Sequence, residues 1–234
     1  MDFNSGIILD AERVEREQAS FITKVYSWMT LALVITAVVA MLTASSPALI
    51  NLIFGNRIGF WVLVLGQLGL VMYLSSAINR MSATVATAAF IVYSVVTGLV
   101  LSSIFVLYTA SSIAATFFVT AGTFGAMSMY GYYTKRDLTK LGSLLVMALI
   151  GLIIASVVNI FWANSTLYWI TTYAGVLIFV GLIAYDTQKI KAMNIIGNEG
   201  TEEDRKEAIM GALTLYLDFI NLFLYLLRLL GSRK

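Results

Sequence analysis

Two aspartates lie inside otherwise apolar runs near the end of this chain, and their positions make them the strongest candidates for chemistry. Asp186 lies between Tyr185 and Thr187, and Asp218 lies near the middle of the run 213–224. A bare carboxylate is costly in hydrocarbon, so an acid in such a run faces a partner, a proton or a water-filled cavity. We therefore predict that Asp186 and Asp218 belong to a functional site.

Helical spacing places both aspartates on polar or small-residue faces. One face of the last apolar run carries Gly211, Thr214, Asp218, Asn221 and Tyr225, with Arg228 near its edge. One face of the preceding run carries Gly175, Phe179, Leu182 and Asp186. Consecutive helices run antiparallel, so the two acids can meet. The alternative is structural: each aspartate separately caps backbone or pairs with Lys189 or Arg80.

Two carboxylates within hydrogen-bonding reach cannot both stay ionised easily, and the pair can share a proton. The chain contains no histidine and no cysteine. The usual titrating group near neutral pH, the commonest transition-metal ligand and thiolate chemistry are thus all missing. Any proton chemistry must use carboxylates or tyrosines, which favours a proton-sensing role for the aspartate pair.

The elements that position these residues are membrane-spanning helices. The sequence is 59% hydrophobic and only 12% charged, whereas a soluble domain carries about 25% charged residues. It has a single proline and no short alternating strands of the kind that form outer-membrane barrels. Apolar runs of about 20 residues suit a bilayer, and seven occur, near 23–43, 58–78, 83–107, 112–133, 141–162, 167–189 and 208–230.

This pattern predicts an all-α integral membrane protein with a bundle of seven transmembrane helices. We expect an N-terminal tail at 1–22 and a single transmembrane domain at 23–234, without internal repeats. The acidic N-terminus is unlike a cleavable signal peptide, so the first span is expected to remain as an anchor. For residues 10–24, a short interfacial helix and a solvated tail both remain open.

Lysines and arginines in the connections favour a cytoplasmic N-terminus, because most of them then lie inside. The exceptions are Arg228, Arg233 and Lys234, which would lie outside after a seventh span. A re-entrant last segment would return these three charges to the inside. Since the last run is long enough to cross, we expect a full span.

The connection 192–207 is the only substantial soluble loop between these runs. Its acidic residues precede the last span, where they suit a helix N-terminus. Thr201 and Asp204 resemble a loose capping box. The acidic spacing differs from that of an EF-hand, so we interpret this stretch as helix initiation and not as a calcium loop.

Two segments resemble hallmark motifs of the transmembrane Bax-inhibitor-motif family, in its bacterial branch. They are Gly181-x4-Asp186-Thr187-Gln188 and the stretch Leu-Tyr-Leu-Asp-Phe-Ile-Asn-Leu-Phe at 215–223. The similarity extends over all the spans, including Thr97-Gly98-Leu99 and Asn159-Ile160-Phe161, and leaves out the N-terminal tail. The motif of the last span is the most specific part.

The resemblance implies a bundle with the last helix central, in a bacterial inner membrane. It also implies that Asp186 and Asp218 form a cytoplasmic-side pair that gates a pH-sensitive calcium leak. Some relatives have a basic residue on the second span that latches the first aspartate, for which Arg80 is the nearest match here. Gln67 stands where some relatives have a glutamate, which puts a further acidic site in doubt.

Calcium takes about six to eight oxygen ligands, and strong sites use several carboxylates. Two aspartates with Asn221, Thr214 and backbone carbonyls would bind calcium weakly, which suits passage of a transported ion. We expect protonation to weaken binding further and deprotonation to open the path. We expect no cofactor apart from calcium as the transported ion. The lipid bilayer is an expected partner, and nucleic acid is not.

Two other function classes compete with a leak. A stress-protective protein could modulate a membrane quality-control protease without transport, with residues 12–18 as its contact. An intramembrane aspartyl protease also carries aspartates on consecutive spans, but it requires a Gly-x-Gly-Asp turn and a Pro-Ala-Leu element. Here Asp218 follows Tyr216 and Leu217, and Pro47 precedes the second span. We therefore expect no enzymatic activity.

Overall fold

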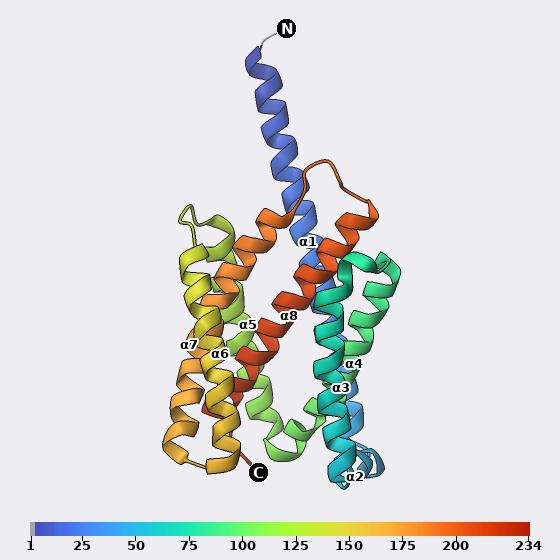
Figure 1. Ribbon diagram of the computed structural model, residues 1–234, viewed down its shortest axis with the longest axis vertical. Helices are drawn as coiled ribbons and strands as arrows, with labels where there is room; N and C mark the ends of the chain where they lie inside the picture. Colours follow the sequence, from blue (N-terminus) through green and yellow to red (C-terminus); the bar gives the residue numbers. More distant parts are fainter. Residues whose placement is uncertain (1–2) are drawn as a thin grey trace. The chain divides into compact units, whose positions relative to one another are not determined.

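The computed structural model describes residues 3–234, and this part of the chain is helical throughout apart from short connections (Figure 1). Its elements in chain order are α1 (Phe3–Ala44), α2 (Pro47–Phe54), α3 (Arg57–Ala77), the short 3-10 helix η1 (Ile78–Arg80), α4 (Ala83–Leu107), α5 (Ala110–Tyr133), α6 (Thr139–Trp162), α7 (Ser165–Met193) and α8 (Glu202–Leu230).

Seven of these helices are long and apolar enough to cross a membrane, which confirms the predicted all-α, seven-span architecture. Helix α8 runs without interruption through Asp218, as expected for a full span and not for a re-entrant hairpin. The short helix α2 was not predicted. Pro47 occupies its first turn and the Ser46 hydroxyl accepts a hydrogen bond from the Leu49 amide, both of which are typical of a helix start.

Helix α1 has 42 residues and is therefore about 63 Å long, far longer than a bilayer requires. Figure 1 shows its N-terminal part extending beyond the ends of α3 and α4. Residues 10–24 belong to this helix, so the stretch for which a solvated tail remained open is helical. Arg13 and Glu17 form an ion pair one turn apart at 2.9 Å, which supports the helix locally.

Backbone contacts divide the chain into two compact units. The first comprises the described residues up to Ser103 together with Ile190–Leu213, and the second comprises Ile104–Lys189 and Thr214–Lys234. Helix α8 contributes to both. It is also the most buried span, with 61% of its apolar window buried against 6% for α3 and for α6, as expected for a central helix.

In the first unit, small and polar side chains join the helices. A Cβ on Gly98 of α4 would lie 2.8 Å from the Thr36 carbonyl oxygen of α1. The Thr36 hydroxyl donates to the Ser94 carbonyl oxygen at 3.0 Å. The Gln67 amide donates to the Thr97 hydroxyl at 2.9 Å, so Gln67 links α3 to α4.

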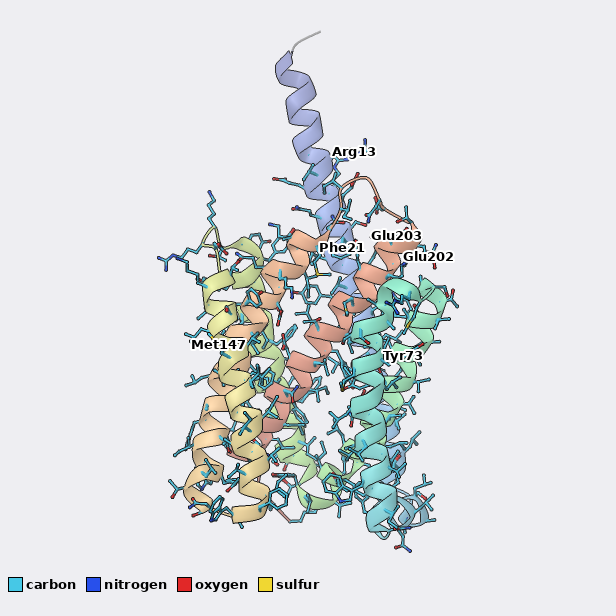
Figure 2. All side chains as sticks on the ribbon, viewed as in Figure 1. Arg13, Phe21, Tyr73, Met147, Glu202 and Glu203 are labelled. Carbon is cyan, nitrogen blue, oxygen red and sulfur yellow. The ribbon has the colours of Figure 1, made fainter. Side chains whose placement is uncertain are left out.

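The start of α8 is fixed within the first unit by the predicted cap and by an ion pair that the sequence did not reveal. The Thr201 hydroxyl accepts a hydrogen bond from the Asp204 amide at 3.2 Å, which confirms helix initiation at this point. The Asp204 carboxylate accepts from the Gly200 amide at 2.9 Å and from the Lys24 ammonium at 2.8 Å. Glu202 and Glu203 lie in the same first turn (Figure 2).

In the second unit, glycines bring α5, α6 and α7 close together, as small residues do in membrane bundles. Gly131 of α5 packs against the backbone of Ala184, and Gly142 of α6 packs against the Tyr185 ring. Any larger residue at either position would have to displace its neighbour. Ala184 and Tyr185 directly precede Asp186, so this packing fixes the backbone that carries the first aspartate.

Candidate functional site

Helices α6, α7 and α8 line a partly open cavity of about 320 Å³ within the second unit. Both predicted aspartates contribute to its wall. The lining residues are Val146, Leu149 and Ile153 from α6, Phe179, Leu182 and Asp186 from α7, and Thr214, Leu217, Asp218, Asn221 and Tyr225 from α8.

Asp186 and Asp218 meet at this cavity. Their side chains are nearly inaccessible, with 9% and 5% exposure, and their carboxyl groups lie within hydrogen-bonding reach of each other. The second carboxyl oxygen of Asp218 has no hydrogen-bond partner among the described residues. A buried polar atom without a partner is costly. A proton held between the two groups, or a cation in the cavity, would relieve that cost.

The polar face of α8 lies where helical spacing predicted it. Thr214, Asp218, Asn221 and Tyr225 all line the cavity. The Asn221 amide donates to the Leu217 carbonyl oxygen at 2.8 Å, so its nitrogen is already committed to the helix backbone. Gly211, the remaining residue of the predicted face, belongs to the first unit and packs near Ile190 and Val25.

The predicted face of α7 also adjoins the cavity. Phe179, Leu182 and Asp186 line it, and the Phe179 ring stacks on the Tyr225 ring with centroids 5.9 Å apart. A Cβ on Gly175 would lie 2.6 Å from that tyrosine ring, so only glycine leaves room for Tyr225 in this position. The tyrosine is therefore held as a wall of the cavity by two residues of α7.

The residues that follow Asp186 secure its position, a role that sequence reasoning did not assign. The Gln188 side chain accepts from the Leu138 amide and donates to the Arg136 carbonyl oxygen, both at 2.9 Å. It thereby ties α7 to the connection between α5 and α6. The Thr187 hydroxyl lies 3.4 Å from that of Ser128 on α5. Thr187 and Gln188 belong to the motif Asp-Thr-Gln. Their adjacency to Asp186 was the sequence signal that could have indicated this positioning role.

The basic residues proposed as latches do not form close ion pairs with Asp186 in what the structure describes. Lys189 is exposed one turn beyond Asp186 and attracts it electrostatically, but no ion pair within 4.0 Å joins them among the described residues. Arg80 is exposed at the end of η1, in the first unit. A latch role for either residue stays a prediction.

Sequence reasoning missed the contribution of α6. Val146, Leu149 and Ile153 follow helical spacing, but apolar residues with this spacing are equally typical of a lipid-facing surface. Nothing in the sequence distinguished these three residues from lipid-facing ones. They give the cavity one wholly apolar wall, so the oxygens available to a cation come from α7 and α8 alone.

The available donors suit weak cation binding. No group of three or more histidine, cysteine, aspartate or glutamate residues gathers as a metal site in the part of the chain that the structure describes. Among the described residues that line the cavity, the side-chain oxygens come from the two carboxyl groups, Thr214, Asn221 and Tyr225. This set falls short of the several carboxylates of a strong calcium site.

Comparison with known proteins places this arrangement in a family. The family described as "Inhibitor of apoptosis-promoting Bax1" matches residues 18–234, which include the whole of the second unit. The chain belongs to this family. The resemblance inferred from the two aspartate motifs is thereby confirmed.

Bacterial family members are similar over nearly their whole length. The "Inner membrane protein YbhL" of Escherichia coli K12 is 55% identical over 216 residues, which is 92% of each chain. A protein of Borreliella burgdorferi is 49% identical over 214 residues, again 92% of each chain. A protein of Deinococcus radiodurans is 40% identical over 227 residues, covering 97% of this chain and 96% of its own.

Proposed function

We propose that this protein is a pH-sensitive leak pathway for calcium, or for cations generally, with Asp186 and Asp218 as its proton-sensing gate. The observation that carries the proposal is the pair of buried carboxyl groups at a cavity between spanning helices, with one Asp218 oxygen lacking a partner. Intramembrane acids of this kind typically mark ion or proton pathways.

The gate follows from the chemistry of paired acids. When the pair holds one proton, a carboxyl–carboxylate hydrogen bond joins α7 to α8 and the net charge at the cavity is reduced. When that proton leaves, two like charges repel and the cavity attracts cations. Lys189 lies one turn beyond Asp186 on α7, while the α6 residues that line the cavity are uncharged. We therefore expect conduction to rise on deprotonation.

Calcium enters this scheme as cargo and not as a resident cofactor. Asp186 and Asp218 would provide its charged ligands, and the oxygens of Thr214 and Asn221 its neutral ones, with Tyr225 along the path. Such a small set binds weakly and releases readily, as passage requires. The named Escherichia coli relative is an inner membrane protein. We propose the same membrane here, with the N-terminus cytoplasmic and Arg80 or Lys189 as latches on the closed pair.

The test is calcium flux into liposomes that contain the purified protein, measured at a series of pH values. Wild-type flux should rise as the pH rises and the pair loses its proton, while Asp186→Asn and Asp218→Asn should each abolish this dependence. Asp137→Asn removes an exposed acid between α5 and α6 and should behave as wild type. Flux that ignores pH in the wild type, or an unchanged profile in Asp218→Asn, would contradict the proposal.

A second candidate is a stress-protective role in which the protein modulates a membrane quality-control protease without transport. It is favoured by a charged groove of about 510 Å³ along the N-terminal part of α1, which we propose to be cytoplasmic. The groove is lined by Glu12, Arg13, Arg16, Glu17, Ser20 and Glu199. Deleting residues 2–20 separates the two functions. A modulator should lose its effect on the protease, whereas a leak should persist.

We propose no enzymatic activity. Two aspartates on consecutive helices also occur in intramembrane aspartyl proteases, but Asp218 lies within an uninterrupted helix instead of a glycine-rich turn. The chain's single proline, Pro47, lies in α2, far in sequence from either aspartate. Incubation with a transmembrane peptide substrate should give no cleavage that depends on Asp218.

A further inference from the structure

The C-terminal end of the second unit gathers arginine and tyrosine side chains that the leak proposal does not use. The Arg228 guanidinium lies 4.8 Å from the centroid of the Tyr168 ring and 5.3 Å from that of Tyr225. The Arg233 guanidinium donates to the Tyr168 hydroxyl at 3.3 Å and lies 5.9 Å from the centroid of the Tyr108 ring. We call these five residues the arginine–tyrosine cluster.

The backbone holds this cluster in place. After α8 ends, residues 231–234 run beside the connection between α4 and α5. The Thr109 amide donates to the Ser232 carbonyl oxygen at 3.0 Å, and the Lys234 amide donates to the Leu107 carbonyl oxygen at 3.0 Å. The chain end is thus tied down on both sides of Arg233, so its guanidinium is positioned by the fold.

In the described part of the chain, neither arginine of the cluster pairs with an aspartate or glutamate. The stretches 104–112, 159–170 and 224–234 that build it contain no aspartate or glutamate. Arg228 is half-buried, and its contacts among the described residues are with ring faces and not with carboxylates. A guanidinium carries five N–H donors, and ring faces and neutral hydroxyls leave its charge uncompensated. Both guanidinium groups contact Tyr168, and two such groups on one side chain favour a shared anion.

The surroundings indicate which anion reaches the cluster. Trp162 at the end of α6 is 79% exposed, and Trp169 near the start of α7 is 44% exposed. Tryptophans at the ends of spanning helices mark the level of the lipid headgroups. Phosphate is the abundant anion at that level, and the planar fork of arginine matches its oxygens with paired hydrogen bonds.

We propose that the arginine–tyrosine cluster binds the phosphate of an anionic phospholipid. Arg228 and Arg233 donate to the phosphate oxygens, the tyrosines orient the two guanidinium groups, and the acyl chains lie along the exposed aromatic surface of α6 and α7. The site gives a physical reason for Arg228 and Arg233, two of the three basic residues that the charge distribution along the sequence does not favour at this end. Because Tyr225 also lines the cavity, the bound headgroup would adjoin the far side of that wall.

The experiment measures lipid binding by the full chain in detergent, using native mass spectrometry. Phosphatidylglycerol, phosphatidylcholine and inorganic phosphate are titrated separately. The wild type should bind phosphatidylglycerol at least about tenfold more tightly than phosphatidylcholine, equivalent to about 1.4 kcal/mol. The double variant Arg228→Gln, Arg233→Gln should lose this preference. The matched control Lys135→Gln, Arg136→Gln removes two charges from the connection between α5 and α6 and should retain it.

Each other outcome overturns the proposal. A wild type without preference for phosphatidylglycerol shows that the cluster is no lipid site, and so does a double variant that keeps the preference. Inorganic phosphate that displaces the lipid at matched concentration shows a site for free anions instead.

If the double variant fails to fold, Arg228→Lys retains the charge but loses the fork and the ring stacking. It should weaken phosphatidylglycerol binding several-fold, and unchanged binding would reject the assignment.

Discussion

Helix α8 carries two aspartates that are buried to nearly the same extent but have opposite surroundings. Asp204, 2% exposed, accepts hydrogen bonds from the Lys24 ammonium and the Gly200 amide. Asp218, 5% exposed, faces the carboxyl group of Asp186 and a cavity, with one oxygen unpartnered among the described residues. One acid has its charge compensated, whereas the other meets a second acid.

The difference shows that burial alone does not indicate the role of an acid. The Asp204 carboxylate lies in the first turn of a helix, where the backbone dipole also favours a negative charge. Its negative charge is therefore compensated by Lys24, the Gly200 amide and the helix N-terminus, and it acts as a structural anchor. Asp218 lies far from either helix end and gains most from a proton or a cation. That is the behaviour expected of a sensor.

The largest expected effect contrasts the same substitution at both positions. Asp204→Asn should lower the free energy of unfolding by about 2 kcal/mol, because hydrogen bonds to a charged group are lost and Lys24 loses its closest partner. Asp218→Asn should cause no loss, because it removes an uncompensated charge from the cavity. Thermal unfolding in detergent measures both. An equal fall in both variants would abolish the distinction between anchor and sensor.

Lys24→Met serves as the reciprocal control. It leaves the Asp204 carboxylate buried without its cation and should match Asp204→Asn in direction and approximate size. Arg16→Met breaks an exposed pair with Glu12 at 3.7 Å and should change stability by less than about 0.5 kcal/mol. A large effect at Arg16 would mean that the lower stability of the Asp204 and Lys24 variants reflects the loss of any charge and not the loss of this particular ion pair.

A smaller effect is expected at Gly175, which leaves room for the Tyr225 ring beside the cavity. Gly175→Ala places a methyl group against the Tyr225 ring and should cost about 1–2 kcal/mol, because a wall of the Asp218 cavity has to move. Gly151→Ala is the matched control on α6, where a Cβ meets nothing within 4 Å. That variant should unfold no earlier than the wild type. If the two behave alike, Tyr225 is not held by packing.

The smallest effect concerns the anchor region. The Glu202 carboxylate accepts a hydrogen bond from the Ala83 amide at 2.9 Å and so caps the start of α4. Glu202→Ala should therefore cost about 1 kcal/mol, a typical value for a lost cap. The neighbouring Glu203 is 66% exposed and pairs loosely with Lys206 at 3.8 Å, so Glu203→Ala should cost less than half as much. Thermal unfolding that ranks them in reverse would refute this assignment of the cap.

Much of the architecture follows from the sequence because its causes are local. Bilayer thickness fixes the length of each apolar run, so seven spans could be counted, and helical pitch fixes which residues share a face. Helical pitch alone predicted the polar face of α8 from Thr214 to Tyr225 and the face of α7 that carries Asp186. Their meeting at one cavity required only that consecutive spans be antiparallel.

Other features depend on pairings between distant parts of the chain. Lys24 and Asp204 are 180 positions apart, and the local sequence around either residue does not predict that they pair. Gln188 bonds to a connection some 50 positions earlier, and α6 presents to the cavity the same apolar spacing that would suit a lipid-facing surface. The arginine–tyrosine cluster likewise joins the chain end to Tyr108 and Tyr168.

Hydrophobicity and periodicity act over a few turns of helix, so the class of protein, the number of spans and the two aspartates could be read from the residues alone. Which buried acid is compensated, and which is not, became clear from the folded protein. The stability of a charge depends on the groups within a few ångströms of it, and those groups come from helices that are remote in the chain.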